Sequence, residues 1–452
     1  MNSVSKSDYL VYKLSDLMKG STRIDAELFK KMDVKRGLRN EDGTGVLAGL
    51  TNIGDVVGYT RDAEGKLKAM PGRLYFRGYE ISDLVHGIER GDRFGFEEIA
   101  YLLLSGHLPD ADELQVFKQM LLTNMPLEKK TLLHIIEMEG HDIMNILARS
   151  VLEFYTFDDN PDDTSRDNLM RQSIELISKF PTIIAYAYNM LRHGEHGRSL
   201  HIRHPQKDLS LAENFLFMLK GKDYTPLDAR TLDLLLILHS EHGGGNNSTF
   251  TVRVTSSSGT DTYSSIAAGI GSLKGPKHGG ANLKVCQMLD WFKRDINDWT
   301  DEAAIHDHVM QILNKDAFDK KGLVYGIGHA VYTLSDPRAE LLKEMARELA
   351  AEKGRSAEFE FLERIERVAI ETIYKLKGRE KPFCANIDFY SGFVYDLIGI
   401  PKEIYTPLFA MARIVGWCAH RNEELNFEGR RIIRPAYKCV TDERDYVELS
   451  DR

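Results

Sequence analysis

The chain has 452 residues, 42% of them hydrophobic and 28% charged, and a formal net charge of −9 at pH 7. This length can bury a substantial core and predicts two or three domains, and the ordinary composition excludes a disordered or fibrous chain. The acidic balance argues against a nucleic-acid-binding surface, because phosphate recognition usually shows as a clear basic excess.

The spacing of the cysteines and the composition of the N-terminus indicate in which cellular compartment the protein is found. The first 20 residues are interrupted by charges and lack the apolar core of a secretory signal. The longest strongly apolar stretch, residues 234–238, is far too short to span a bilayer. No CxxC pair occurs, which argues against a zinc ribbon or a disulfide framework and favours a reducing compartment. We therefore expect a cytoplasmic protein without a membrane anchor. The scattered cysteines are Cys286, Cys384, Cys418 and Cys439.

In chain order, the first clear structural signal is a strand pattern over residues 74–81, LYFRGYEI. Helical apolar spacing then marks residues 94–109, and Gly106 is the expected end of that helix. The next helix is predicted over residues 110–124, with Asp110 as its N-cap. Strand signals of this kind are few in the chain, so helices are expected to dominate the fold.

The second half of the chain continues this helical pattern. Residues 249–255, TFTVRVT, are rich in β-branched side chains but lie between helical segments, so strand and helix both stay open. Asp336 as N-cap and Pro337 at the first position predict a helix that ends at Gly354. The sequence predicts an all-α protein. Further expected elements are helices over 357–378 and 407–425 and a strand over 430–440.

Glycines cluster beside histidines in three segments, HSEHGGGNNS from His239, GPKHGGAN from Gly275 and GIGHAVYTLSDPR from Gly326. Glycine permits close ligand approach that a Cβ would forbid, so such clusters indicate a backbone shaped around a ligand. A fourth segment, NIDFYSG from Asn386, contains Asp388. Each segment alone is explained more simply by a capping or core residue, but their combination favours a functional site.

Two familiar motifs do not fit these segments. GSLKGPKHGG resembles a phosphate loop, but His278 follows Lys277 where GxxxxGK[ST] requires Ser or Thr, which excludes a nucleoside-triphosphate loop. His239 and His242 stand three residues apart but do not form HExxH, and the spacing supplies no further ligands, so no metal site is expected. A helix C-terminus that ends in the glycines 243–245 explains the pair better.

One carboxylate and two imidazoles supply the groups needed to form a carbon–carbon bond from a thioester. That reaction needs a base for a weakly acidic proton, a donor to the enolate oxygen and an acid to polarise the acceptor ketone. His278 precedes a helical-looking run at 281–292. A helix N-terminus there would disfavour imidazolium and keep a neutral N–H donor, as in another enolising enzyme.

The chain resembles the citrate synthase family from about residue 37 to about residue 434, in segments that follow the family's order. The resemblance implies a two-domain all-α fold and a homodimer. After an N-terminal segment of uncertain structure, 1–36, a large helical domain would take 37–278 and 389–452, and a smaller mobile domain would take 279–388. The segments are LYFRGYEISDL, PQKDLSLAENFLFML, HSEHGGGNNSTFT, GSLKGPKHGGAN, GIGHAVYTLSDPR, NIDFYSG, MARIVGW and IIRP.

The resemblance also implies an activity, the condensation of acetyl-CoA with oxaloacetate to citrate and CoA, without a metal or a redox cofactor. Asp388 would remove the methyl proton, His278 would hold the thioester oxygen and His329 would protonate the oxaloacetate carbonyl. Arg434 would be donated to the neighbouring site across the dimer. The other implied substrate contacts are His242, Asn246, Arg338 and Arg413 for oxaloacetate and Gly326, Gly328, Arg379 and Lys381 for CoA.

Thr333 departs from the family pattern, because some members carry a basic residue there that is associated with CoA phosphate binding. Two alternatives to a citrate synthase remain. A 2-methylcitrate synthase uses propionyl-CoA with the same catalytic set, and one methylene changes discrimination by only about 1–3 kcal/mol. A non-catalytic scaffold has no chemical need for the full set of groups. Oxaloacetate and an acyl-CoA are the expected partners, with no nucleic acid and no membrane.

Overall fold

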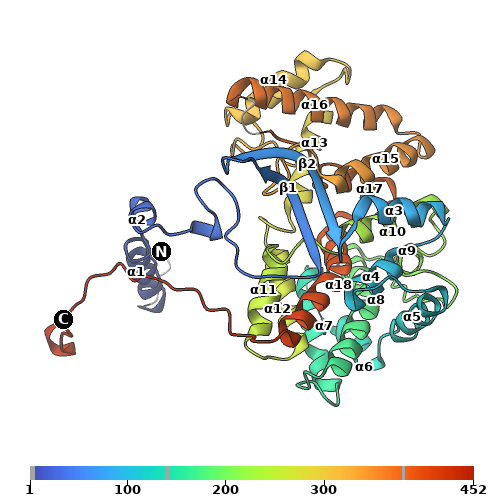
Figure 1. Ribbon diagram of the computed structural model, residues 1–452, viewed down its shortest axis with the longest axis horizontal. Coiled ribbons are helices and arrows are strands. Elements are labelled where there is room, and N and C mark those ends of the chain that lie inside the picture. The colour runs from blue at the N-terminus through green and yellow to red at the C-terminus, as the bar shows by residue number, and fades with distance from the viewer. Residues whose placement is uncertain (1–5, 139–141, 379–381) are drawn as a thin grey trace. The chain divides into compact units, whose positions relative to one another are not determined.

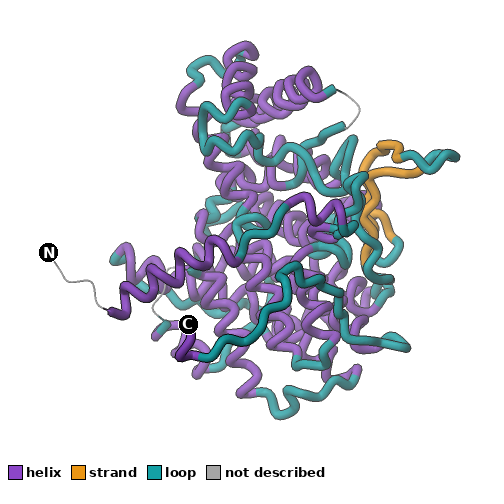
Figure 2. The backbone as a smooth tube through the Cα atoms, turned by 90° about the vertical axis from the view of Figure 1, so that its left-hand side faces the viewer, coloured by secondary structure: helices purple, strands orange, loops and turns teal. Residues whose placement is uncertain are grey.

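The computed structural model describes residues 6–138, 142–378 and 382–452 of the chain (Figure 1). Helices dominate these residues, which confirms the all-α prediction. Within the described ranges, strands form one three-stranded antiparallel sheet, drawn in orange in Figure 2. No helix of the described residues is both long enough and apolar enough to cross a bilayer.

The sheet follows helices α1 and α2 and precedes the main helical part. The early elements are α1 (Lys6–Ser21), α2 (Ala26–Lys31), β1 (Gly54–Arg61), β2 (Leu67–Phe76) and β3 (Tyr79–Glu80). The next helices are α3 (Ile81–Arg90), α4 (Phe96–Ser105), α5 (Ala111–Asn124), α6 (Lys129–Glu137), α7 (Ile143–Phe157), α8 (Arg166–His196), α9 (Leu211–Lys220) and α10 (Pro226–His239). The last are α11 (Asn247–Ser257), α12 (Thr262–Lys274), α13 (Ala281–Asp295), α14 (Glu302–Leu313), α15 (Pro337–Glu352), α16 (Ser356–Lys377), α17 (Asp388–Leu397) and α18 (Tyr405–Asn426).

Contacts divide the chain into two compact units, Met1–Ala48 with Ile433–Arg452, and Gly49–Ile432. The segment 1–36, whose structure the sequence left uncertain, contains α1 and α2 in its described part. All elements from β1 to α18 belong to Gly49–Ile432. The small domain expected over 279–388 stays a prediction.

The helices end where their capping residues predict. Gly106 adopts φ 87° directly after α4, a conformation that glycine reaches without strain. Asp110 caps α5 by accepting a backbone N–H at 2.8 Å. Asp336 caps α15 by accepting the N–H of Arg338 at 3.0 Å, with Pro337 in the first turn. These caps satisfy N–H groups that have no partner inside the helix.

Tertiary contacts decide whether the segments with ambiguous sequence patterns form a helix or a strand. Residues 249–255 lie in α11, where Thr249 and Val252 are buried and the helix packs on α12 and α18, so packing overrides β-branched propensity. The strand predicted over 74–81 is present as the end of β2 and as β3. The strand predicted over 430–440 is wrong. That segment is irregular and almost fully exposed, and Pro435 removes one backbone donor, so strand pairing would stabilise it little.

Helix α18 is buried along most of its length and carries part of the site. It packs against α4, α8, α10, α11 and α12. Trp417, Arg413 and Arg421 are among its fully buried side chains. Arg421 donates to hydroxyl groups on α11 and α12 and to the carbonyl of Thr260 at 2.7 Å, which satisfies its buried charge.

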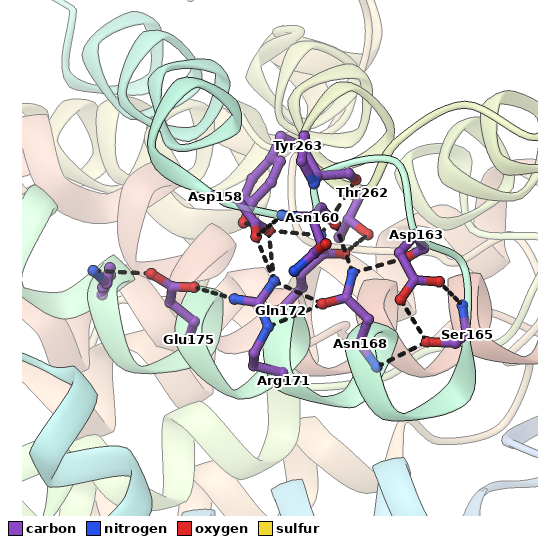
Figure 3. A network of polar contacts seen from close by, with 12 residues as sticks. Asp158, Asn160, Asp163, Ser165, Asn168, Arg171, Gln172, Glu175, Thr262 and Tyr263 are labelled. Atoms are coloured by element: carbon purple, nitrogen blue, oxygen red, sulfur yellow. Dashed lines mark hydrogen bonds and ion pairs between the residues drawn. The ribbon is translucent and has the colours of Figure 1, made fainter.

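A polar network ties the end of α7 to α8 and α12 (Figure 3). Asp158 accepts from Nη2 of Arg171 at 2.6 Å and from Nε2 of Gln172 at 2.8 Å. It also accepts from the hydroxyl of Tyr263 at 2.7 Å. Burial alone would raise the pKa of Asp158, but the hydrogen bonds outweigh it and hold the pKa well below its usual range. Asp158 is therefore an ionised centre that joins three helices.

Candidate active site

The turn after α10 places His242. Helix α10 begins after Thr225, its N-cap, and ends at His239. His242 is buried, and its ring centre lies 5.1 Å from that of His329. Its Nε2 atom is buried and has no hydrogen-bond partner among the described residues. Burial first, and then nearby positive charge, holds the pKa of His242 well below its usual value, so the imidazole is neutral at pH 7.

His278 lies before α13 and contacts the N-terminal turn of α11. The backbone N–H of Ser248 donates to Nε2 of His278 at 3.3 Å, and the Ser248 hydroxyl lies 3.0 Å from the same atom. That hydroxyl also accepts from Nε1 of Trp417 at 3.2 Å and lies 3.0 Å from Oδ1 of Asn246. Because Nε2 accepts a backbone N–H, the proton of neutral His278 is on Nδ1.

His278 is neutral, as the sequence predicted, and two causes lower its pKa. Burial lowers the pKa of His278 to about 4, and the charge of Arg413 acts in the same direction. Phe409 contacts both groups, with its ring centre 6.1 Å from that of His278 and 4.8 Å from Cζ of Arg413. Desolvation and a neighbouring cation thus explain the neutral imidazole.

The turn that follows His329 holds its imidazole. Nδ1 of His329 accepts from the backbone N–H groups of Val331 and Tyr332, both at 3.0 Å. The ring of Tyr332 stacks on the imidazole, with 4.6 Å between ring centres and 25° between the ring planes. Since Nδ1 is an acceptor, the proton of a neutral His329 is on Nε2.

Asp388 is the first residue of α17, and the segment before it fixes its backbone. Its N–H donates to Oδ1 of Asn386 at 3.0 Å, and Nδ2 of Asn386 donates to the carbonyl of Gly328 at 2.8 Å. Gly326 has φ 81°, and a Cβ there would lie 2.9 Å from the ring of Phe389. The two glycines expected to contact CoA therefore pack against the segment that carries Asp388.

Arg413 and Arg338 are both buried but differ in their partners. Arg413 donates through Nε to the carbonyl of His239 at 2.6 Å, whereas its Nη1 and Nη2 have no partner among the described residues. Burial lowers the pKa of Arg413 to about 10, and Glu241 acts in the opposite direction, so the guanidinium is charged at pH 7. Arg338 donates to Asp336 through Nε at 3.0 Å and Nη2 at 2.8 Å. Arg413 therefore presents the fork that suits a carboxylate ligand.

These groups form one cluster within Gly49–Ile432. Burial raises the pKa of Asp388 to about 6, and the charges of the two buried arginines act against that rise. The charge of Arg413 also lowers the pKa of both His278 and His242, and His242 contacts His329. The predicted site residues that the cluster brings together are His242, Asn246, His278, His329, Arg338, Asp388 and Arg413.

The roles of three other predicted positions stay predictions. Arg434 is exposed and belongs to the unit that contains Ile433–Arg452. Arg379 and Lys381 lie outside the described residues. Over the described ranges, no group of three or more His, Cys, Asp or Glu side chains is arranged to hold a metal ion.

Sequence reasoning did not identify four residues that shape the cluster. Ser248 and Tyr332 determine which nitrogen of each histidine carries the proton, and Phe409 contacts Arg413. Glu241 is fully buried and accepts from Nε2 of His420 at 2.9 Å. Ser248, Tyr332 and Glu241 lie inside the glycine–histidine segments, but their residue types carry no catalytic signal without the tertiary contacts.

The fold and the cluster are those of a helical enzyme, and the cluster combines a carboxylate with a raised pKa, two neutral imidazoles and a buried arginine whose terminal nitrogens have no partner among the described residues. The family model "Citrate synthase, C-terminal domain" matches residues 42–436. The chain belongs to the citrate synthase family, whose members are acyltransferases. A citrate synthase of Deinococcus radiodurans is 38% identical over 80% of this chain and 90% of that protein. A 2-methylcitrate synthase of Shewanella oneidensis is 33% identical over 84% of this chain and 90% of that protein.

Solved structures of citrate synthases also resemble this chain. Citrate synthase from Pyrobaculum aerophilum superimposes with a TM-score of 0.73 at 31% identity, covering 90% of this chain and 94% of that chain. The ternary complex of a Thermoplasma acidophilum citrate synthase with carboxymethyl coenzyme A and oxaloacetate superimposes with a TM-score of 0.73 at 26% identity. It covers 93% of this chain and 99% of that chain. The likeness therefore extends over nearly the whole length of these two structures.

Proposed function

We propose that this protein condenses acetyl-CoA with oxaloacetate through an enol intermediate and hydrolyses the citryl thioester to citrate and CoA. The observation that carries the proposal is the fully buried Arg413, whose Nη1 and Nη2 lack partners among the described residues, in a cluster where Nε2 of His242 lacks one too. A small dicarboxylate supplies partners for these buried polar atoms. The relative solved with carboxymethyl coenzyme A and oxaloacetate supports the same substrate pair.

In this mechanism Asp388 takes a proton from the methyl group of acetyl-CoA. A pKa of about 6 leaves the carboxylate ionised at pH 7 but makes it a stronger base than an exposed aspartate. His278 donates from Nδ1 to the thioester oxygen and stabilises the enol while remaining neutral. His329 donates from Nε2 to the oxaloacetate carbonyl, whose oxygen takes the proton as the enol carbon attacks the ketone carbon.

Oxaloacetate is bound by Arg413, Arg338 and His242, with Asn246 beside them. Arg413 offers both terminal nitrogens to one carboxylate, whereas the pair with Asp336 fixes the orientation of Arg338. In a homodimer, Arg434 of the partner subunit contacts the second carboxylate. This arrangement supplies the positive charge that an acidic chain must concentrate locally to bind a dianion.

The acyl-CoA is bound beside this pocket, and closure of a mobile domain over 279–388 excludes water and protects the enol. The proposed CoA contacts are Gly326, Gly328, Arg379 and Lys381. The reaction uses no metal or redox cofactor, since the carboxylate and the imidazoles provide all the acid–base chemistry. We place the enzyme in the cytoplasm, where it would catalyse the citrate-forming step of the tricarboxylic acid cycle. We expect it to bind neither nucleic acid nor a membrane.

Thiol release, followed with a thiol-reactive dye, tests this proposal. Release is expected to require both oxaloacetate and an acyl-CoA, with a higher kcat/KM for acetyl-CoA than for propionyl-CoA. A preference for propionyl-CoA would instead assign a 2-methylcitrate synthase, the activity named for the Shewanella oneidensis relative. No release with either thioester would favour a non-catalytic scaffold.

A further inference from the structure

The imidazole of His329 depends on two backbone N–H groups for its orientation. Val331 and Tyr332 donate to Nδ1 at 3.0 Å each, and Tyr332 also stacks on the ring. A shift of this turn would therefore rotate or tilt the imidazole and move the proton on Nε2. What holds the backbone of residues 331–335 thus sets the geometry of His329.

The β1–β2 hairpin packs directly against that backbone through two glycines. A Cβ at Gly58 would lie 2.3 Å from the carbonyl oxygen of Val331, and one at Gly72 would lie 2.2 Å from that of Ser335. Neither glycine has a positive φ, so their role is to leave space for a close approach. The N–H of Gly72 also donates to the Ser335 hydroxyl at 3.2 Å.

Thr333 joins the same turn to both strands of the hairpin. Its hydroxyl contacts the carbonyl oxygen of Gly58 and lies 3.1 Å from that of Met70. The strand register shifts between Val57 and Tyr59, so Gly58 lies at an irregularity in the ladder, and its carbonyl accepts from the Thr333 hydroxyl. The residue that departs from the family pattern therefore has a defined structural partner here.

The start of the hairpin contacts the turn that carries His242. A Cβ at Gly54, the first residue of β1, would lie 2.9 Å from Cγ of Glu241, the neighbour of His242. The N–H of Asn52 donates to Glu423 on α18 at 2.8 Å. One hairpin thus contacts both the turn that carries His242 and the turn that carries His329.

We propose that the β1–β2 hairpin is a clamp that positions His329 relative to His242, with Gly58, Gly72 and Thr333 as its contact points. This inference rests on the proposed function, because it takes His329 as the acid in the condensation. Thr333 is a positioning residue, since it acts on His329 through the backbone of the turn. The clamp explains why a hydroxyl suits this position, because it donates to a carbonyl that a valine methyl group would leave unpaired.

Thr333→Val removes the hydroxyl at nearly constant volume, and Thr333→Ser retains it. Misplacement of a reacting group by an ångström can cost about a hundredfold in rate, so a partial shift is expected to lower kcat about tenfold in Thr333→Val. Thr333→Ser is expected to recover most of this loss. Thr60→Val changes an exposed threonine of the same hairpin and serves as the matched control, with kcat close to wild type.

A double-mutant cycle separates positioning from general destabilisation. If Thr333 acts through His329, Thr333→Val causes no further loss of rate in a His329→Asn background. The melting temperature of the double variant should stay near those of the two single variants. An unchanged kcat in Thr333→Val, an equal loss in Thr60→Val, or a full additional loss in the His329→Asn background would overturn the clamp. Wild-type protein that releases no thiol would instead reject the proposed function, so the two failures are distinct.

Glycine variants test the close approach independently. Gly58→Ala and Gly72→Ala place a methyl group against the backbone of the turn and are expected to lower kcat at least as much as Thr333→Val. Gly49→Ala is the control, because a Cβ there has no atom within 4 Å. Normal kcat in folded Gly58→Ala protein would contradict the clamp, and the Thr333 series decides the question if that variant does not fold.

Discussion

The backbone N–H of Ser248 lies 3.3 Å from Nε2 of His278 and donates to it, which leaves the imidazole proton on Nδ1. Removal of this donor to the enolate, in His278→Ala, is expected to lower kcat about 10²–10³-fold, the typical effect of losing one oxyanion donor. The KM for oxaloacetate should change little. Ser248→Ala keeps the backbone N–H and should lose less than about tenfold. Equal losses in the two variants would contradict a tautomer set by the backbone.

The pH dependence of turnover is expected to follow Asp388. Burial raises its pKa to about 6, and the base must be ionised, so kcat/KM for acetyl-CoA should fall with a slope of one as the pH drops below about 6. His278, with a pKa lowered to about 4, stays neutral across this range. Initial rates between pH 4.5 and 8 check the prediction, with melting temperatures measured in the same buffers. If kcat/KM for acetyl-CoA did not change down to pH 5, Asp388 would not be the group whose protonation causes the loss of activity at low pH.

Replacement of Arg413 should separate stability from binding. Its terminal nitrogens are buried without partners among the described residues, so Arg413→Met removes a costly unpaired cation and should leave the melting temperature equal or higher. Oxaloacetate at a hundred times its Kd should stabilise wild-type protein by about 2.7 kcal/mol and should not stabilise the variant. Calorimetric melting with and without oxaloacetate measures both effects.

Arg253→Met is the matched control for a buried arginine that is already paired. Arg253 donates to Glu423 at 2.7 Å and lies 2.9 Å from the buried Glu424, so its loss removes the cation that faces Glu424 and leaves Glu423 with its N–H donor from Asn52. It is expected to cost about 3–5 kcal/mol of stability. If Arg413→Met were as destabilising as this control, Arg413 would have a structural role in place of the ligand-binding one.

Asp158 should make stability depend on pH in a defined direction. Its pKa in the folded protein is held well below the usual value, so it stabilises the fold fully above about pH 4, and this contribution is lost as the pH falls toward the folded pKa. Asp158→Asn should therefore be less stable by on the order of 2 kcal/mol at pH 7, with a smaller difference at pH 3. Urea unfolding at both pH values measures this. Asp159→Asn, at the exposed neighbour, should stay within about 0.5 kcal/mol of wild type, and a similar loss there would contradict the assignment.

Mixed dimers test whether Arg434 acts in the neighbouring subunit. Asp388→Ala and Arg434→Ala proteins are each expected to be inactive, with dimerisation preserved. If Arg434 acts across the dimer, each mixed dimer has one complete site, and random reassociation should restore about a quarter of wild-type activity. If it acts within its own subunit, no mixed dimer has a complete site, and the mixture stays inactive.

Local chemistry in the sequence predicted the helical framework well. Asp110, Asp336 and Gly106 mark helix ends because a cap or a left-handed residue satisfies backbone groups within a few residues, and no distant contact is required. Residues 249–255 could not be assigned, because burial against α12 and α18 decides their helical form. The strand predicted over 430–440 failed because strand pairing is a property of neighbours and not of residue type.

The sequence by itself determined which chemical groups are available: a carboxylate at Asp388, imidazoles at His278 and His329, and the glycines that allow a tight backbone. Only the tertiary structure decided their states. Burial, a property of the whole packed chain, raises the pKa of Asp388 and lowers that of His278. Backbone N–H groups contributed by α11 and by the turn at 331–332 select the nitrogen that carries each proton. Proton position and basicity depend on neighbours brought together by folding, and residue identity alone does not specify them.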